Sequence, residues 1–259
     1  MPSSTFKIEL DKAKDRFLTG EGRITHLELL AEYAHIAFDT HKGRTKYLKG
    51  YTTDEIRRYA GVFPDLQAYV NRYGPHEGYW RWSRSLPRKV NRLLYQHLVV
   101  FLVTILEAFI EDVLLLVLHE QPKCLSSREK DISWEKVIEL GDYASVVDYF
   151  ASQTVATVLS GDWYKIVEKF NKLFNIDLSS EIDGKSIAEI FEIRHAVVHN
   201  VGLADQRFIN KVQPSEWGIR YSLNKEIILD QQRVERMVSY VEYVVESIYD
   251  SILSKFRTN

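Results

Sequence analysis

The chain has 259 residues, enough for one large domain or two small ones with a substantial core. Only six prolines and twelve glycines argue against a loop-rich β protein and against long disordered linkers. A formal net charge of −2 provides no global attraction for nucleic acid, so any such binding must use a local basic surface. The single cysteine, Cys124, cannot form an internal disulfide, which fits a reducing compartment, and we interpret it as an ordinary thiol rather than a nucleophile.

We expect residues 1–89 to form an N-terminal helical section, to which the sequence assigns no role. The helical spacing of apolar residues predicts helices over residues 5–18, 25–40 and, in two pieces separated at Gly61 to Pro64, 51–74. The stretch "GPHEGYWRWSRSLPRK", residues 74–89, combines turn residues with aromatic and basic ones. We expect this stretch to separate the N-terminal section from the rest of the chain.

Residues 90–259 carry a stronger helical pattern and form the second predicted domain. A long helix is predicted from Val90 to about His119, followed by helices near 133–139, 142–159, 161–176, 184–200 and 230–256, the last capped by Asp230. The segment "WGIRYSLNKEIIL", residues 217–229, alternates and predicts a short β-hairpin around Asn224. No strand alternates with a helix at βαβ spacing, so the expected fold class is all-α, a helical bundle with a short β-hairpin before the last helix.

One part of the long helix is apolar enough to raise the question of a membrane span: "HLVVFLVTILEAFIEDVLLLVLHE", residues 97–120. Its apolar run is interrupted by Glu107, Glu111 and Asp112, and an aspartate at mid-bilayer costs roughly 2.5–3.5 kcal/mol. We therefore expect the central, buried helix of a globular bundle. The first residues lack the apolar core of a signal peptide, so we expect a cytoplasmic protein.

The stretch "FEIRHAVVHNVG", residues 191–202, places Arg194, His195 and His199 in an apolar helix that then reaches Asn200 and Gly202. At about 100° per residue, the two histidines lie about 40° apart around the helix, whereas Arg194 and His199 lie about 140° apart. The histidines can therefore share a ligand directly, but Arg194 reaches the same point only where the helix loosens. Asparagine and glycine are residues on which helices end, so a cluster here can converge on one small anion.

Three interpretations of this cluster compete. Cationic side chains near a helix C-terminus interact favourably with the helix dipole and with exposed carbonyls, which would make the cluster structural. Histidines at i and i+4 can bind zinc, but the glutamate of the HExxH motif is replaced by Ala196, no third ligand is evident, and the neighbouring arginine opposes a cation. The third interpretation is catalytic.

Metal-free RNA cleavage needs a base for the 2′-hydroxyl proton, an acid for the leaving 5′-oxygen and a fixed positive charge on the phosphate. Histidine titrates near neutral pH, and a neighbouring guanidinium both lowers its pKa and grips phosphate with two donors. His199 as base or acid, with Arg194 as the phosphate clamp, meets these requirements.

The spacing of Arg194 and His199 near the end of a helix in an all-α protein resembles the signature of the HEPN superfamily. The segment "FLVTILEAFIEDVL", with Glu107 embedded, resembles the long early helix of HEPN domains. The order of "DWYKIVEKFNKLFNIDL", "IAEIFEIRHAVVHNVGLAD" and a terminal amphipathic helix is similar to that of bacterial stand-alone members. The resemblance covers about residues 90–256.

The resemblance implies a four- or five-helix bundle that dimerises and brings two motifs together across the two-fold axis. Many such proteins are metal-independent endoribonucleases of toxin–antitoxin or antiviral defence systems, so we expect no cofactor, and we expect RNA, a second copy of the chain and an antitoxin or regulatory protein as partners. The products would be a cyclic phosphate and a 5′-hydroxyl. Some members are non-catalytic modules that bind nucleotide, RNA or a partner protein, and this alternative stays open.

The resemblance also implies roles for individual residues. Arg194 and His199 are the catalytic pair, and His195 occupies the variable polar position between them. Asn200 would bond the phosphate or hold the turn. Glu107 would be a supporting partner of Arg194 or merely an acid paired inside the bundle, and the two interpretations are equally good.

The aromatic-basic stretch "YWRWSRSLPRK" offers a separate candidate for RNA binding through its cations, Arg81, Arg84, Arg88 and Lys89. Mixtures of rings and cations suit single-stranded RNA, because bases stack on the rings while the cations hold phosphates. We prefer the plainer interpretation, in which the tryptophans are packing anchors and the arginines a solvated face.

Overall fold

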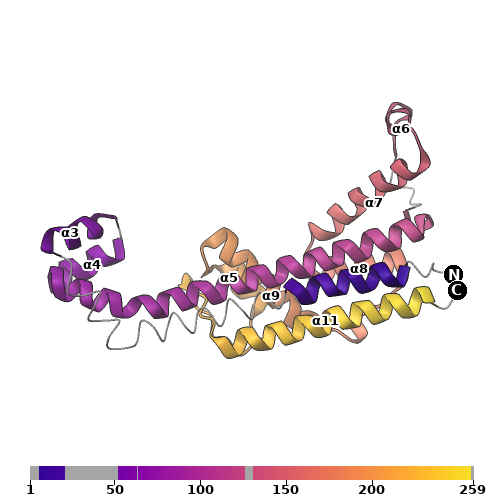
Figure 1. Cartoon of the computed structure of the whole chain (residues 1–259). Helices are drawn as coiled ribbons and strands as arrows, with labels where there is room; N and C mark the ends of the chain where they lie inside the picture. Colours follow the sequence, from indigo (N-terminus) through magenta and orange to yellow (C-terminus); the bar gives the residue numbers. More distant parts are fainter. Residues whose placement is uncertain (1–5, 21–51, 63, 126–130, 258–259) are drawn as a thin grey trace. The chain divides into compact units, whose positions relative to one another are not determined.

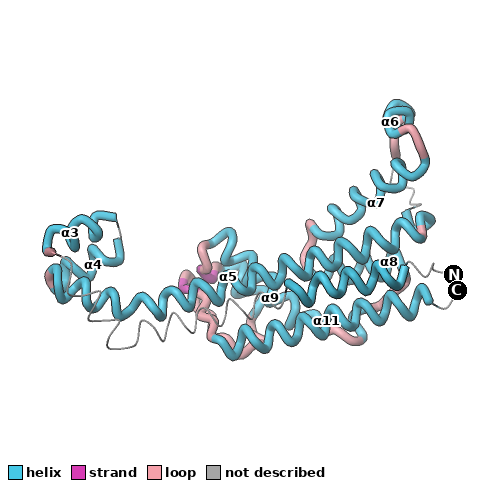
Figure 2. Tube along the Cα trace, viewed as in Figure 1, coloured by secondary structure: helices cyan, strands magenta, loops and turns pink. Residues whose placement is uncertain are grey.

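The computed structural model describes residues 6–20, 52–62, 64–125 and 131–257, which are almost entirely helical (Figures 1 and 2). They divide into two compact units, Met1–Ile24 with Gln96–Asn259, and Thr25–Tyr95. This division differs from a single boundary at residue 90, because the helix over residues 6–20 belongs to the same unit as Gln96–Asn259. The helix predicted over residues 25–40 lies outside the described residues.

The unit Thr25–Tyr95 contains α3 (Thr53–Val62), α4 (Pro64–Tyr73) and the first part of α5 (Pro75–Glu120). The two short helices confirm the pair predicted within residues 51–74. Their small core comprises Ile56, Ala60, Leu66 and Val70, with Tyr79 of α5 packed against it.

The turn-rich stretch of residues 74–89 is helical rather than a linker, because α5 runs through it without a break. The turn is confined to Gly74, whose φ of 83° is in the left-handed region that glycine tolerates. Pro75 is the first residue of α5, a position where its missing N–H has no helical partner to lose. The same turn residues that predicted a linker therefore act as a helix start.

The larger unit is a bundle in which α5, α8 (Trp163–Phe174), α9 (Gly184–Asn200) and α11 (Gln231–Arg257) enclose an apolar core. In α9, Ile187, Ile190, Ile193 and Ala196 recur every three residues and are all buried. At about 100° per residue these positions span about half of the helix circumference, and Phe191 and Glu192 are buried as well, so α9 is enclosed on several sides. Beyond its first turn, the helix is exposed only near its C-terminus, at Val198 and His199, at the edge of the bundle.

The second half of α5 is the central helix that the sequence predicted. It is buried on several sides, through Leu98, Val99, Leu102, Val103, Leu106, Phe109, Ile110, Val113, Leu114, Val117 and Leu118. Among the described helices, none contains a stretch of the length and hydropathy that would be needed to cross a membrane.

The helix over residues 6–20 lies alongside α5 and α11 (Figure 1). Its buried residues Phe6, Leu10, Ala13 and Phe17 follow helical spacing and face the bundle core. Ion pairs flank this apolar seam: Lys14 lies 2.6 Å from Glu246 of α11, and Arg16 lies 2.7 Å from Asp112 of α5. The helix is thus an integral wall of the bundle.

The remaining elements are short. They are η1 (Pro122–Leu125), α6 (Trp134–Leu140), α7 (Tyr143–Leu159), η2 (Leu178–Ser180), α10 (Gln206–Val212) and the strands β1 (Leu203–Ala204) and β2 (Lys225–Glu226). The hairpin predicted within residues 217–229 is not formed, since β2 pairs antiparallel with β1, which directly follows α9. An alternating segment needs a partner edge, and the chain leaving α9 is closer than the segment's own first half.

We predict that Phe17→Ala lowers the free energy of unfolding by about 3–5 kcal/mol, the usual cost of emptying a buried phenylalanine site. Phe17 is 2% exposed and packs edge-on against Phe109 at 6.2 Å between ring centroids. Urea denaturation measures the loss. Ile8→Ala on the same helix, at a residue 52% exposed, should change stability by no more than about 0.5 kcal/mol. Equal small effects would mean that this helix is not part of the bundle.

Candidate functional site

Helix α9 begins and ends at well-defined caps. The carboxylate of Asp183 accepts hydrogen bonds from the backbone N–H groups of Lys185 and Ser186, at 3.1 and 3.2 Å. At the other end, Val201 and Gly202 take left-handed φ values of 53° and 75°, and the Gly202 N–H donates to the Ala196 carbonyl at 3.0 Å. The Val201 N–H donates to the same carbonyl, so two residues in the left-handed region close the end of the helix.

The end of α9 is fixed against α5 and β2 through Gln96 and Ile227. The Gly202 carbonyl accepts the Ile227 N–H at 2.8 Å, and the Ile227 carbonyl accepts the buried Gln96 side-chain amide at 2.8 Å. A Cβ at position 202 would lie 2.7 Å from Gln96 Oε1. Only glycine fits this position, both for its backbone angle and for the space.

Arg194 extends toward α5, where its Nη2 lies 3.4 Å from Glu107 Oε2. Burial raises the pKa of Glu107, and the charge of Arg194 opposes that shift. The Nε of Arg194 is buried and has no hydrogen-bond partner among the described residues. Both interpretations of Glu107 fit this pairing, because it orients the guanidinium and also balances an acid inside the bundle.

His195 and His199 contact each other, with ring centroids 4.5 Å apart, as their i, i+4 spacing predicts. His195 is partly buried and His199 is exposed. Burial lowers the pKa of His195, and the nearby charge of Arg207 lowers it further, whereas Glu192 acts in the opposite direction. His195 is therefore held in its neutral form near pH 7.

Asn200 holds the turn that follows α9, which is one of the two roles expected for it. Its side-chain amide donates to Asp205 Oδ2 at 2.7 Å. The other carboxylate oxygen of Asp205 accepts the Phe208 N–H at 2.7 Å and so caps α10. Asn200 thereby fixes where α10 begins relative to α9.

Helix α10 brings two cations to the site that sequence reasoning missed. Arg207 Nη1 lies 3.3 Å from His195 Nε2, and Lys211, one turn later, forms an ion pair with Glu192 of α9. The sequence held a signal for this helix: Asp205 is a capping residue, and Phe208 and Val212 are apolar at i, i+4. Seven residues gave too short a pattern to single it out.

The segment after α10 is anchored to α9 by the buried carboxylate of Glu189. It accepts hydrogen bonds from the Ser215 hydroxyl at 2.5 Å, the Glu216 N–H at 2.8 Å and the Tyr221 hydroxyl at 2.6 Å. Burial raises the pKa of Glu189 and that of Tyr221. Because these groups satisfy one another, Glu189 is a structural acid that keeps α10 against α9.

The predicted RNA-binding cations of the aromatic-basic stretch belong to the other unit. Arg81 pairs with Glu77 at 2.6 Å and lies over the Tyr73 ring at 4.5 Å, so it has local partners. The side chains of Arg84, Arg88 and Lys89 lie outside the described part of the structure. RNA binding by this stretch stays a prediction.

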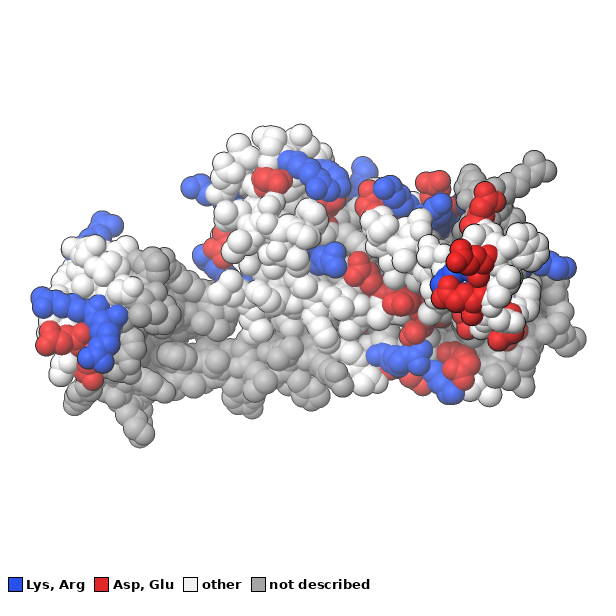
Figure 3. All heavy atoms as spheres, turned by 90° about the horizontal axis from the view of Figure 1, so that it is seen from above, with Lys and Arg blue, Asp and Glu red and all other residues white. Residues whose placement is uncertain are grey.

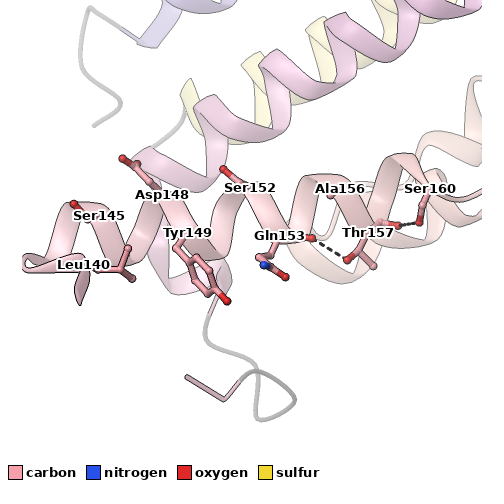
Figure 4. Close-up of a pocket in the computed structure, with 9 residues that line it drawn as sticks. All are labelled: Leu140, Ser145, Asp148, Tyr149, Ser152, Gln153, Ala156, Thr157 and Ser160. Atoms are coloured by element: carbon pink, nitrogen blue, oxygen red, sulfur yellow. Dashed lines mark hydrogen bonds between the residues drawn. The ribbon is translucent and has the colours of Figure 1, made fainter. Parts of the chain in front are cut away.

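Two other hollows of the larger unit do not offer a cationic surface. The open groove along α7 (Figure 4) is lined by Leu140, Ser145, Asp148, Tyr149, Ser152, Gln153, Ala156, Thr157 and Ser160, which include no lysine, arginine or histidine. A cavity of about 250 Å³ between α8 and the segment after α10 has four carboxylates in its wall and two lysines. Neither suits a phosphate.

Charges of both signs are interspersed over the face seen in Figure 3, so no broad single-sign field covers it. The cations at the end of α9 are therefore a local cluster, as the near-neutral net charge requires of any anion site. Among the described residues, no group of three or more histidine, cysteine, aspartate or glutamate side chains is placed to hold a metal ion. Cys124 is partly buried, which raises its pKa.

The fold is an all-α bundle, and the cluster of Arg and His residues lies near the end of its helix α9. The family model described as RiboL-PSP-HEPN matches residues 83–254, and the chain belongs to this HEPN family. The match spans more than half of the chain and confirms the resemblance drawn from the sequence. Comparison with curated proteins and with solved structures gave no match.

We predict that Gly202→Ala destabilises the protein more than Gly141→Ala does. Both glycines have left-handed φ values, 75° and 82°, so each substitution incurs about 1–2 kcal/mol of backbone strain. Only position 202 adds a clash with Gln96, which costs about 1–3 kcal/mol more, since nothing lies within 4 Å of a Cβ at position 141. Urea denaturation compares the two, and equal losses would contradict a fixed contact at the end of α9.

Proposed function

We propose that this protein is a metal-independent endoribonuclease of a defence or toxin–antitoxin system. The observation that carries the proposal is the contact of two imidazoles with each other and with the guanidinium of Arg207 near the end of α9, the helix that also carries Arg194. Membership of a HEPN family supports an RNA-related role. The formal net charge of −2 means that an anion must be bound by a local group of cations such as this one.

In the proposed reaction, an imidazole removes the proton of a ribose 2′-hydroxyl, and the 2′-oxygen attacks the neighbouring phosphorus. The bond from phosphorus to the 5′-oxygen breaks, and that oxygen takes a proton from an acid. The products are a 2′,3′-cyclic phosphate and a 5′-hydroxyl. His199 is the acid or base, because it is exposed and its ring is not covered by Arg207. Arg194 holds the phosphate as negative charge develops.

The alternative is a non-catalytic HEPN-like module that binds nucleotide, RNA or a partner protein. The pairing of Arg194 with Glu107 favours it, because a guanidinium held by a carboxylate must share its donors with a phosphate. Arg194 keeps a third of its side chain exposed, at 33%, and a guanidinium has five donors, so both contacts are compatible.

We predict that the purified protein cleaves RNA in the presence of a chelator, and that Arg194→Ala or His199→Ala lowers the rate by about 100-fold or more. The products should carry a cyclic phosphate and a 5′-hydroxyl, detected by gel mobility and enzymatic end-labelling. His119→Ala, at an exposed histidine paired with Asp148 at the far end of α5, is the matched control and should cleave at the wild-type rate. Binding of RNA without cleavage would favour the alternative instead.

We further propose that the active form is a dimer with a composite site. The support is an apolar surface beside His199: Val198 is 51% exposed, Val201 84% and Leu203 43%. Exposed apolar residues next to a motif indicate a surface that a partner covers. A second copy would bring two motifs together there, as the family resemblance implies.

A mixture of the Arg194→Ala and His199→Ala proteins, allowed to exchange subunits, should regain cleavage that neither variant has alone. The mixed dimer carries one intact Arg194 and one intact His199 at the shared site. Gel filtration with light scattering would show the dimer, and Val201→Asp should weaken it by placing a charge in the apolar contact. A monomeric protein that cleaves at full rate would contradict the composite site.

A further inference from the structure

We propose that Arg207 also binds a phosphate of the RNA, in addition to the contact proposed for Arg194. This inference rests on the proposed function and extends it to a residue outside the Arg–His motif. Arg207 is carried by α10, so neither its spacing from His199 nor its helix belongs to the motif.

The position of Arg207 places it within the cluster. Its Nη1 lies 3.3 Å from His195 Nε2, and the His195 ring contacts that of His199 at 4.5 Å between centroids. The three side chains therefore form one continuous surface on the end of α9. Arg207 and His199 are both exposed, so a phosphate approaching His199 from solvent meets Arg207 as well.

The contact between Arg207 and His195 is a weak substitute for an anion. A guanidinium has only donors, so it can bond the imidazole only when Nε2 is unprotonated and accepts. The charge of Arg207 is also one cause of the lowered pKa of His195. A phosphate is a better acceptor, because it carries a charge opposite to that of the guanidinium and can accept two of its N–H groups in parallel.

The other cations around α9 already have carboxylate partners. Arg194 pairs with Glu107, and Lys211 pairs with Glu192. Arg207 has no carboxylate within 4.0 Å among the residues that the structure describes. Its charge interacts with the Asp205 carboxylate, which caps α10, but it forms no ion pair, so its donors remain available to a ligand.

The backbone that carries Arg207 is held in place. Asp205 caps α10 and is itself bonded by Asn200, while Phe208 is buried and packs edge-on against Tyr221 at 4.8 Å between ring centroids. The Glu189 network fixes the segment on the other side of α10. Only the side chain of Arg207 must move for its donors to leave His195 and bond a phosphate. Binding therefore costs little conformational entropy of the backbone.

The test measures binding apart from cleavage. A fluorescent single-stranded oligonucleotide with 2′-O-methyl riboses cannot be cut by 2′-hydroxyl attack, and its affinity is measured by anisotropy over a series of salt concentrations. Each lost phosphate contact reduces the slope of log K against log salt by about 0.7 for single strands. Arg207→Ala should weaken binding several-fold and reduce the slope by that amount, whereas Arg207→Lys, which keeps the charge, should retain the slope.

Arg220→Ala, at an exposed arginine outside the cluster, is the matched control and should bind as the wild type does. An unchanged slope in Arg207→Ala would overturn the inference, even where affinity fell through altered packing. If the wild type binds the oligonucleotide but does not cut unmodified RNA of the same sequence, the nuclease proposal fails and the slope still decides on Arg207. If the wild type does not bind at all, both fail.

Discussion

The left-handed end of α9 is the constraint on which the site depends. Gly202 turns the chain out of the helix, and its carbonyl and its missing Cβ let Ile227 and Gln96 close around it. Because this junction fixes the last turn of α9, it also fixes the direction in which the side chain of His199 points away from the helix. Only two residues separate Gly202 from Asp205, which caps α10, and Asn200 donates a hydrogen bond to Asp205. The motif and α10 are therefore parts of one small structure.

Around this junction some charged side chains form ion pairs and others do not. This difference distinguishes the roles of the residues. Glu107 accepts from Arg194 within a partly buried setting, which orients the guanidinium and reduces its freedom. Glu192 forms an ion pair with Lys211, and Glu189 accepts hydrogen bonds from two hydroxyl groups and one backbone N–H. Arg207 forms no ion pair with a carboxylate among the described residues, although the charge of Asp205 acts on it. A polyanion bound beside the histidines would therefore meet the donors of Arg207.

The larger features of the fold could be predicted because they depend on local pattern. Apolar spacing gave α6 to α9 and α11 nearly at their observed bounds, and the i, i+4 spacing of His195 and His199 gave their contact. Three features could not be predicted in this way. Pro75 is typical of a turn but begins a helix. Strand β2 pairs with a strand about twenty residues earlier, and helix α10 is too short for its periodicity to be recognised. Each of these depends on which distant segment is nearby.

By itself, the sequence determined that the chain is an all-α bundle of HEPN type with an Arg–His motif at a helix end, since helix periodicity and motif spacing are properties of consecutive residues. Only the tertiary structure decided which charges meet. Glu107 and Arg194 are 87 residues apart in the chain, and Arg207 reaches His195 from a different helix. Partners of this kind are set by how helices pack, and packing is fixed by the whole core rather than by any one segment.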